Sequence, residues 1–199
     1  MKTLLKTILG AIALVAAFPW ALISGFGRSP ALFEFGAQLF ARAPGIPGSY
    51  LRVAYYKLTL EHVGEGCHIA IGSYFAHAQS SIGNRVGLGA YCVLGCVSID
   101  DGTIFGSGAQ VLSGLRQHSR DNSGQLTGAG RRFDRVTIGR ECWIGAAAIV
   151  MANLGDMVTV SPGSVVSSPV GSGVVVVGNP ARPVRVISGV QQKSANQPQ

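Results

Sequence analysis

Aliphatic residues recur at every sixth position over the second half of the chain. Two series have this spacing, separated by a shortened step: Ile138, Ile144, Val150 and then Leu154, Val160, Val166. Four positions after most of them stands a small or medium residue: Cys142, Ala148, Val158 and Ser164. A period of six fits neither an α-helix nor a simple strand. It predicts a solenoid in which every short flat face points one aliphatic residue inward.

The same period begins earlier, less regularly. Ile82, Leu88 and Leu94 keep it, and Ile99, Phe105 and Val111 resume it one residue out of step. The slip predicts a bulge or a tightened corner between Cys96 and Asp100. Because inward-pointing residues keep the six-residue spacing before and after the slip, we expect one solenoid domain over residues 62–188.

The period stops over residues 113–135, a polar, Gly- and Ser-rich segment that is too long for an ordinary corner. Such segments carry function when a rigid scaffold presents them. His118 lies near its start, and a histidine is a natural general base because its pKa lies near neutral pH. From spacing alone, however, a solvated loop histidine is the favoured interpretation.

Residues Thr7 to Gly27 carry no charge and approach the roughly 20 residues that span a bilayer. A cleaved signal peptide, a spanning helix, a helix that enters the interface and turns back, and a buried soluble helix all fit. No clear cleavage site follows a short apolar region, and Pro19-Trp20 favours a kink near the headgroup level.

Two shorter amphipathic helices are expected next, over 31–42 and 50–60, with a sharp break at 44–48. Either helix could lie on a membrane or cover the open end of the solenoid, whose strand edge must be protected. Residues 1–61 therefore form an N-terminal membrane-seeking and capping region, and residues 189–199 are expected to form a disordered tail.

The net charge of +7 on a chain with only 13% charged residues suits anionic partners. Coenzyme A, lipid headgroups and sugar diphosphates all qualify, whereas no nucleic-acid module is visible. Six basic residues lie in or beside the 113–135 loop: Arg116, Arg120, Arg131, Arg132, Arg135 and Arg140. They form either a solvated face or a surface that meets an anionic acceptor or membrane.

The four cysteines, Cys67, Cys92, Cys96 and Cys142, show no CxxC pair and no metal-ligand spacing with a histidine. Cys92 and Cys142 fall on the small inward positions of the repeat, where a free thiol acts as a small hydrophobe. This usage favours a reducing compartment.

Three motifs give the chain a family resemblance: Trp143-Ile144-Gly145, Gly163-Ser164-Val165-Val166 and Gly178-Asn179-Pro180-Ala181-Arg182. From about His62 onward, it resembles the hexapeptide-repeat acyltransferases, in particular the galactoside and maltose O-acetyltransferases and the exopolysaccharide-modifying acetyltransferases. The resemblance implies an all-β, left-handed parallel β-helix. It also implies a homotrimer with active sites between subunits, acetyl-CoA as donor, and no metal.

The resemblance makes His118 the catalytic base, because it follows a turn that contains Asp100 and Asp101 and opens a projecting loop. Asp100 or Asp101 would orient the imidazole or contact the acceptor, unless they only form a solvated corner; Asp121 is the other carboxylate that could lie beside His118. For the donor, the resemblance places Ala146 and Pro162 along pantetheine, and Arg182 and Arg185 near the nucleotide.

These expectations combine into an O-acetyltransferase that acts on a hydroxyl of a saccharide, such as a lipid-linked or polysaccharide precursor. Acetyl-CoA is cytosolic, and Arg28, Arg42, Arg52 and Lys57 follow the apolar run. Both favour an inner-membrane association with the catalytic domain in the cytoplasm.

Two other functions fit a solenoid of this kind. One is a non-catalytic membrane-associated scaffold. The other is a γ-type carbonic anhydrase, which needs three zinc-binding histidines. His62, His68 and His77 lie near the first coils, but their spacing lacks the close histidine pair of that family.

Overall fold

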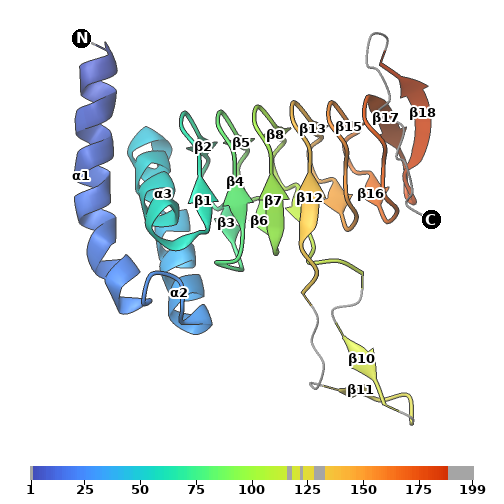
Figure 1. Cartoon of the computed structure of the whole chain (residues 1–199), viewed down its shortest axis with the longest axis horizontal. Helices are drawn as coiled ribbons and strands as arrows, with labels where there is room; N and C mark the ends of the chain where they lie inside the picture. The colour runs from blue at the N-terminus through green and yellow to red at the C-terminus, as the bar shows by residue number, and fades with distance from the viewer. Residues whose placement is uncertain (1, 116–117, 122, 128–132, 188–199) are drawn as a thin grey trace, which may run out of the picture.

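A computed structural model describes residues 2–115, 118–121, 123–127 and 133–187. Three helices come first: α1 (Lys2–Ile23), α2 (Pro30–Ala41) and α3 (Gly45–Thr59). A parallel β-solenoid follows, with a hairpin projecting from it (Figure 1). Its strands are β1 (His62–Val63), β2 (His68–Ile69), β3 (Tyr74–Phe75), β4 (Ser81–Ile82), β5 (Gly87–Leu88), β6 (Val93–Leu94), β7 (Val97–Ile99), β8 (Ile104–Phe105), β9 (Gln110–Val111), β10 (Ser119–Arg120), β11 (Leu126–Thr127), β12 (Val136–Ile138), β13 (Trp143–Ile144), β14 (Ile149–Val150), β15 (Thr159–Val160), β16 (Val165–Val166), β17 (Val174–Val177) and β18 (Arg182–Val186).

Each of the first four coils contributes one short strand to each of three sheets, which form the three faces of the solenoid. Later coils reach the first of these faces only through isolated bridges at Leu154 and Val170. Face I is the sheet β1-β4-β7-β12, face II is β2-β5-β8-β13-β15-β17 with β18 added, and face III is β3-β6-β9-β14-β16. The chain visits them in the order I, II, III, so each coil turns at corner I–II and corner II–III. It enters the next coil through corner III–I.

The six-residue series forms the core, as predicted. Ile144, Val150 and Val160 are fully buried, and the second inward positions Ala148 and Val158 are buried with them. Stacking these residues removes apolar surface from water on every coil, which is the main stabilising contribution.

Cys92 and Cys142 also occupy inward positions, as expected, and both are free thiols. Burial raises the pKa of Cys142 to about 11. The slip in the series is a tightened corner: only Gly95 and Cys96 separate β6 from β7.

The N-terminal helices cover the first coil, whose edge would otherwise expose unpaired backbone groups. Ser49 and Tyr56 of α3 accept hydrogen bonds from the backbone N–H groups of Ile69 and Phe75, both at 3.1 Å. At the end of α2, the Ala41 carbonyl accepts a hydrogen bond from Gly72 N–H at 2.8 Å. The capping role expected for these helices is therefore filled by specific side chains.

Arg52, which the sequence groups with the flanking basic residues, is completely buried. Its Nε donates to the Ile69 carbonyl at 2.9 Å, and its Nη1 donates to the carbonyls of Phe40 at 3.0 Å and Ala43 at 2.6 Å. The Phe40 and Ala43 carbonyls lie at and just after the end of α2, where the helix dipole favours a cation. Arg52 thus fastens α2 and α3 to the first coil, and it is not part of a solvent-facing basic flank.

The break between the two amphipathic helices is shorter than predicted. α2 ends at Ala41, but α3 already begins at Gly45 and includes Pro47 in its first turn. Proline is tolerated there because the first N–H groups of a helix have no partner within the helix.

α1 runs along α3 (Figure 1), and its outer face is apolar. Its segment Lys6–Ile23 is long and apolar enough to cross a membrane, with only 17% of the segment buried. Ala13, Ala17 and Ala21 face the protein and are buried, whereas Ile12 is 60% and Val15 is 75% exposed. One side of the helix therefore packs closely on the protein and the other side is left uncovered.

Candidate active site

The projecting loop leaves the solenoid at corner III–I, between β9 and β12 (Figure 1). Ser113 holds its two ends together. The Ser113 Oγ accepts a hydrogen bond from Cys96 N–H at 2.8 Å, and the Ser113 carbonyl accepts one from Asp134 N–H at 3.1 Å. The loop therefore begins and ends at the tightened corner that caused the slip in the sequence pattern.

The returning arm of the loop packs on earlier coils. Arg135 donates to Glu61 at 2.6 Å and to the Gln79 carbonyl at 3.1 Å. The ring of Phe133 lies against the His77 imidazole, with centroids 4.4 Å apart. Burial lowers the pKa of His77, and the charge of Glu34 opposes that shift only in part. His77 is a half-buried imidazole at the loop base, whereas the sequence singled it out only as a possible zinc ligand.

The tip of the loop is an antiparallel hairpin of β10 and β11, in which Arg120 pairs with Leu126. Asp121 closes its turn: its Oδ1 accepts hydrogen bonds from the N–H of Ser123 at 2.9 Å, the Ser123 hydroxyl at 2.6 Å and Gln125 N–H at 3.0 Å. The Ser123 hydroxyl, followed by the Gln125 N–H, lowers the pKa of Asp121. This carboxylate is committed to the hairpin turn.

His118 lies immediately before β10 and is exposed. β10 separates His118 from Asp121, whose Oδ1 is held by the hairpin turn. The hairpin therefore presents the imidazole to solvent at its stem, while Asp121 serves the turn at its tip.

Asp100 and Asp101 lie at a different corner, I–II, directly after β7. The Asp101 Oδ1 accepts hydrogen bonds from the N–H of Asn84 at 2.7 Å and from its side-chain amide at 3.3 Å. These bonds lower the pKa of Asp101, the backbone bond contributing most. The same corner is fastened in other coils by Asn84, which accepts from Glu65 N–H, and by Asp156, which accepts from Arg140 N–H.

These hydrogen bonds between successive coils form a ladder at corner I–II. Asp101 has a partner in it from the preceding coil, whereas the neighbouring Asp100 side chain is exposed. The structure does not bring either carboxylate to the corner from which the loop carrying His118 projects.

Three of the four expected donor residues share the remaining corner, II–III. Ala146 and Pro162 occupy equivalent places in successive coils, because Trp143 pairs with Thr159 and Ile144 with Val160. Both are exposed. Arg182, which pairs with Val177 at the end of β17, continues the same line.

Arg185 pairs with Val175, at the opposite end of β17. It therefore lies toward corner I–II, away from the line formed by Ala146, Pro162 and Arg182.

Of the six basic residues near the loop, three are described. Arg135 pairs with Glu61, and Arg120 donates to the Gly124 carbonyl at 2.7 Å, so both stabilise the loop itself. Arg140 lies exposed at corner I–II. Arg116, Arg131 and Arg132 lie outside the described residues, as does the tail 189–199.

The outer surface of face II carries large apolar side chains. Trp143 is 53% and its cross-strand neighbour Ile104 is 55% exposed. The Trp143 side chain therefore points out of the solenoid and is not part of its core.

Among the residues that the structure describes, no group of three or more His, Cys, Asp or Glu could hold a metal ion. His62 and His68 begin β1 and β2, and His77 lies in the corner after β3.

Solved structures share this fold. A maltose O-acetyltransferase from Clostridium difficile 630 aligns with a TM-score of 0.69 and 20% identity, over 84% of this chain and 91% of that one. A galactoside acetyltransferase in complex with coenzyme A aligns with a TM-score of 0.66 and 19% identity, over 81% and 84%. AntD, an N-acyltransferase from Bacillus cereus in complex with dTDP and 3-hydroxybutyryl-CoA, aligns with a TM-score of 0.51 and 18% identity, over 63% and 71%.

No protein-family model matches the chain, and no curated protein sequence matches it. At these identities the structural likeness establishes the fold. It confirms the solenoid of the hexapeptide-repeat acyltransferases that the sequence motifs implied.

Proposed function

We propose that the protein transfers an acetyl group from acetyl-CoA to a hydroxyl of a saccharide. The observation that carries the proposal is a solvent-exposed histidine, His118, at the stem of a loop that projects from the solenoid. The comparisons support the chemistry, because proteins of this fold include acetyltransferases and one was solved with coenzyme A. A sugar acceptor agrees with the maltose and galactoside acetyltransferases that share the fold.

In this mechanism the His118 imidazole takes the proton of the acceptor hydroxyl as its oxygen attacks the thioester carbonyl. The carbon–sulfur bond breaks as the new ester forms, and the imidazolium returns its proton to the departing thiolate of coenzyme A. Backbone N–H groups stabilise the oxyanion between the two steps. The reaction needs both substrates together and no acyl-enzyme.

The donor is proposed to lie along corner II–III. The exposed backbone at Ala146 and Pro162 would meet the pantetheine amides, and the guanidinium of Arg182 would meet the nucleotide phosphates. Arg185 would reach the nucleotide only from the far end of β18.

Catalysis by this arrangement calls for more than one copy of the chain. The His118 loop, the Asp100–Asp101 turn and the donor line occupy three different corners of one solenoid. In a homotrimer about the long axis, the corner of one copy can meet a different corner of the next. The exposed pair Ile104 and Trp143 on face II supports such a contact, since a neighbouring copy would cover it.

Membrane association is proposed through the outer face of α1. Since Ala13, Ala17 and Ala21 pack on the protein, a spanning orientation would draw the rest of the cap into the hydrocarbon. A helix that lies in the interface or dips into it keeps the packing and buries Ile12 and Val15 in lipid. With acetyl-CoA as donor, the solenoid would face the cytoplasm at the inner membrane.

The test is coenzyme A release by the full-length protein in detergent, with acetyl-CoA and a panel of lipid-linked and nucleotide-linked sugars. We expect acceptor-dependent release that falls by about 100-fold or more in His118→Ala, the contribution of a general base. His62→Ala is the matched control, because His62 is also exposed but lies in the first coil, and it should release coenzyme A at the wild-type rate.

Equal rates for wild type and His118→Ala would remove His118 as the base. A matching loss in His77→Ala would move that role to the half-buried imidazole at the loop base. Failure of every acceptor, together with no binding of acetyl-CoA, would favour the non-catalytic scaffold.

A further inference from the structure

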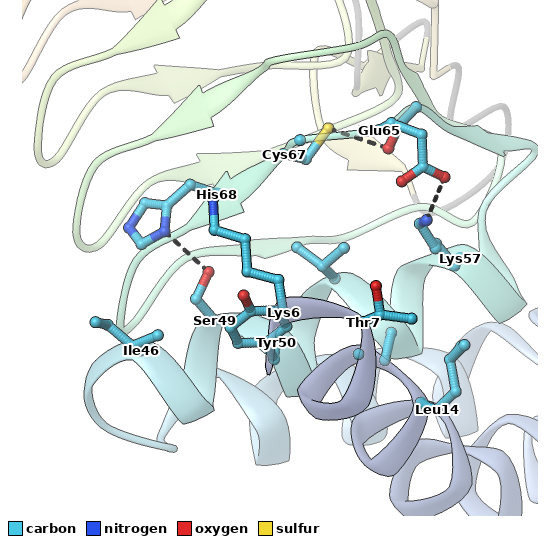
Figure 2. A pocket seen from close by; sticks show the side chains of 16 residues that line it. Lys6, Thr7, Leu14, Ile46, Ser49, Tyr50, Lys57, Glu65, Cys67 and His68 are labelled. Atoms are coloured by element: carbon cyan, nitrogen blue, oxygen red, sulfur yellow. Dashed lines mark hydrogen bonds and ion pairs between the residues drawn. The ribbon is translucent and has the colours of Figure 1, made fainter. Parts of the chain in front are cut away.

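A pocket of about 810 Å³ lies between α1, α3 and the first coil, away from the projecting loop (Figure 2). This volume is in the range of small-molecule sites, which are about 300–1,000 Å³. α1 supplies Lys6, Thr7, Gly10, Ala11 and Leu14 on one side, and the turn from Gly64 to His68 supplies the other. α3 forms the wall between them.

One part of the pocket is apolar. Leu14 of α1 and Val53 and Ala54 of α3 line it, and Gly10 leaves space between the helices. A Cβ built on Gly10 meets no atom within 4 Å. This part of the pocket has the shape and lining to accept a hydrocarbon chain.

The other part is cationic. Lys57 pairs with Glu65 at 2.7 Å on the side of the pocket away from His68, whereas the Lys6 side chain extends toward His68 (Figure 2). Because Glu65 balances the charge of Lys57, the positive charge that remains is that of Lys6. An anionic group is therefore the ligand chemistry that this end favours.

His68 lies at the same end as Lys6. The Ser49 Oγ accepts a hydrogen bond from Ile69 N–H and forms a second hydrogen bond, of 3.1 Å, with the His68 Nδ1. This bond engages Nδ1 and leaves Nε2 as the other polar atom of the ring. The Lys6 ammonium is therefore the cationic donor that this end offers to an anion, with the imidazole beside it.

The pocket also adjoins the face of α1 that meets the membrane in the proposed function. The lining residues follow a helical spacing on one side of α1, whereas Ile8, Ile12 and Val15 lie on another side and are 47%, 60% and 75% exposed. A lipid in the outer layer around α1 would therefore have a short path between α1 and α3.

We propose that this pocket binds a lipid with a phosphate head, its hydrocarbon chain along Leu14 and Val53 and its phosphate beside Lys6 and His68. The turn 64–68 and the Asp100–Asp101 turn share corner I–II and are two coils apart, about 10 Å at the usual strand spacing. Resting on the proposed acetyl transfer, this makes the pocket the anchor for a lipid-linked saccharide acceptor.

The test uses the full-length protein in phosphatidylcholine nanodiscs and a probe with a phosphomonoester head and a diazirine in its alkyl chain. After photolysis, peptide mass spectrometry is expected to find labels on the α1 and α3 residues that line the pocket. Unlabelled phosphatidylglycerol and an isoprenyl phosphate compete in separate arms, and the stronger competitor identifies the natural source. Labels confined to the outer residues Ile12 and Val15, or unaffected by both competitors, would overturn the proposal.

Variants separate the pocket from the bulk bilayer. Gly10→Phe fills the apolar part and should reduce pocket labelling by about tenfold, whereas Gly10→Ala, the matched control, should leave it unchanged. Lys6→Ala should weaken probe binding by about tenfold, the effect of one charge-assisted hydrogen bond. Arg28→Ala, which removes an exposed cation outside the pocket, should have no effect. Thermal melting checks that each variant is folded.

The labelling contains no acetyl-CoA, so it is independent of the catalytic test. His118→Ala should be labelled like the wild type. Pocket labelling without any acetyl transfer would keep the lipid site and discard its acceptor role. Acetyl transfer without pocket labelling would keep the proposed catalytic function and discard the lipid site.

Discussion

Coils of the solenoid are fastened to one another, whereas the hairpin at the tip of the projecting loop is fastened mainly to itself. Ile144 of one coil sits between Phe105 and Val160 of its neighbours, and all three are buried. In the hairpin, Asp121 and Arg120 bond to groups within a few residues of themselves, and Leu126 is 66% exposed. Stability thus resides in the stack, and the loop is free to present polar chemistry.

The largest effect that would test this contrast is a cavity in the stack. Ile144→Ala should lower the free energy of unfolding by about 2–5 kcal/mol, because neighbouring coils cannot collapse into the space. Leu126→Ala in the hairpin should change it by about 0.5 kcal/mol or less. Urea denaturation followed by circular dichroism measures both, and equal losses would contradict the comparison.

A smaller effect is expected from a polar group inside the stack. The Thr103 Oγ1 donates to the Gly139 carbonyl at 2.8 Å and accepts from Cys142 N–H at 3.0 Å, and Thr103 is fully buried. Thr103→Val leaves both backbone groups without this partner and should cost about 1–3 kcal/mol. Thr137→Val, at an exposed position on β12, is the control. If both variants unfold at the wild-type urea concentration, the coils do not depend on such bonds.

The smallest effect concerns the corner ladder and pH. Since its bonds to Asn84 lower the folded-state pKa of Asp101, the carboxylate stabilises the fold above its unfolded pKa of about 3.9. That stabilisation is lost as the pH falls through the folded value.

Asp101→Asn keeps an oxygen acceptor but removes the titration, so its melting temperature should fall less steeply than that of the wild type below about pH 4. Asp100→Asn, at the exposed neighbour, is the comparison. Melting temperatures are measured from pH 7 to pH 2.5. If they fell in parallel for the wild type and Asp101→Asn, the stabilising role of the Asp101 carboxylate would be refuted.

The repeating part of the chain was predictable because its rule is local. A buried aliphatic residue at every sixth position has one simple geometric explanation, and the interruption of the pattern locates the loop. The slip before Ile99 indicated a bulge or tightened corner between Cys96 and Asp100, and the structure has the tightened corner slightly earlier, at Gly95 and Cys96.

The N-terminal cap was predictable only in outline. Helical periodicity indicated two amphipathic helices, but it could not indicate that Arg52 is buried, because its partners are backbone carbonyls of α2 and of the first coil. The start of α3 was predicted too late, because Gly and Pro disfavour a helix interior but are tolerated in a first turn.

By itself, the sequence determined the solenoid, its inward residues, the loop and the apolar N-terminal helix. The six-residue spacing indicates the first two, its interruption indicates the loop, and an uncharged apolar run indicates the helix. Only the tertiary structure decided which corner each candidate group occupies, because that depends on how many residues each turn consumes. It placed the His118 loop, the Asp100–Asp101 turn and the Ala146–Pro162 line at three separate corners, and it opened a pocket between α1, α3 and the first coil. Contacts between residues far apart in the chain leave no pattern in the sequence.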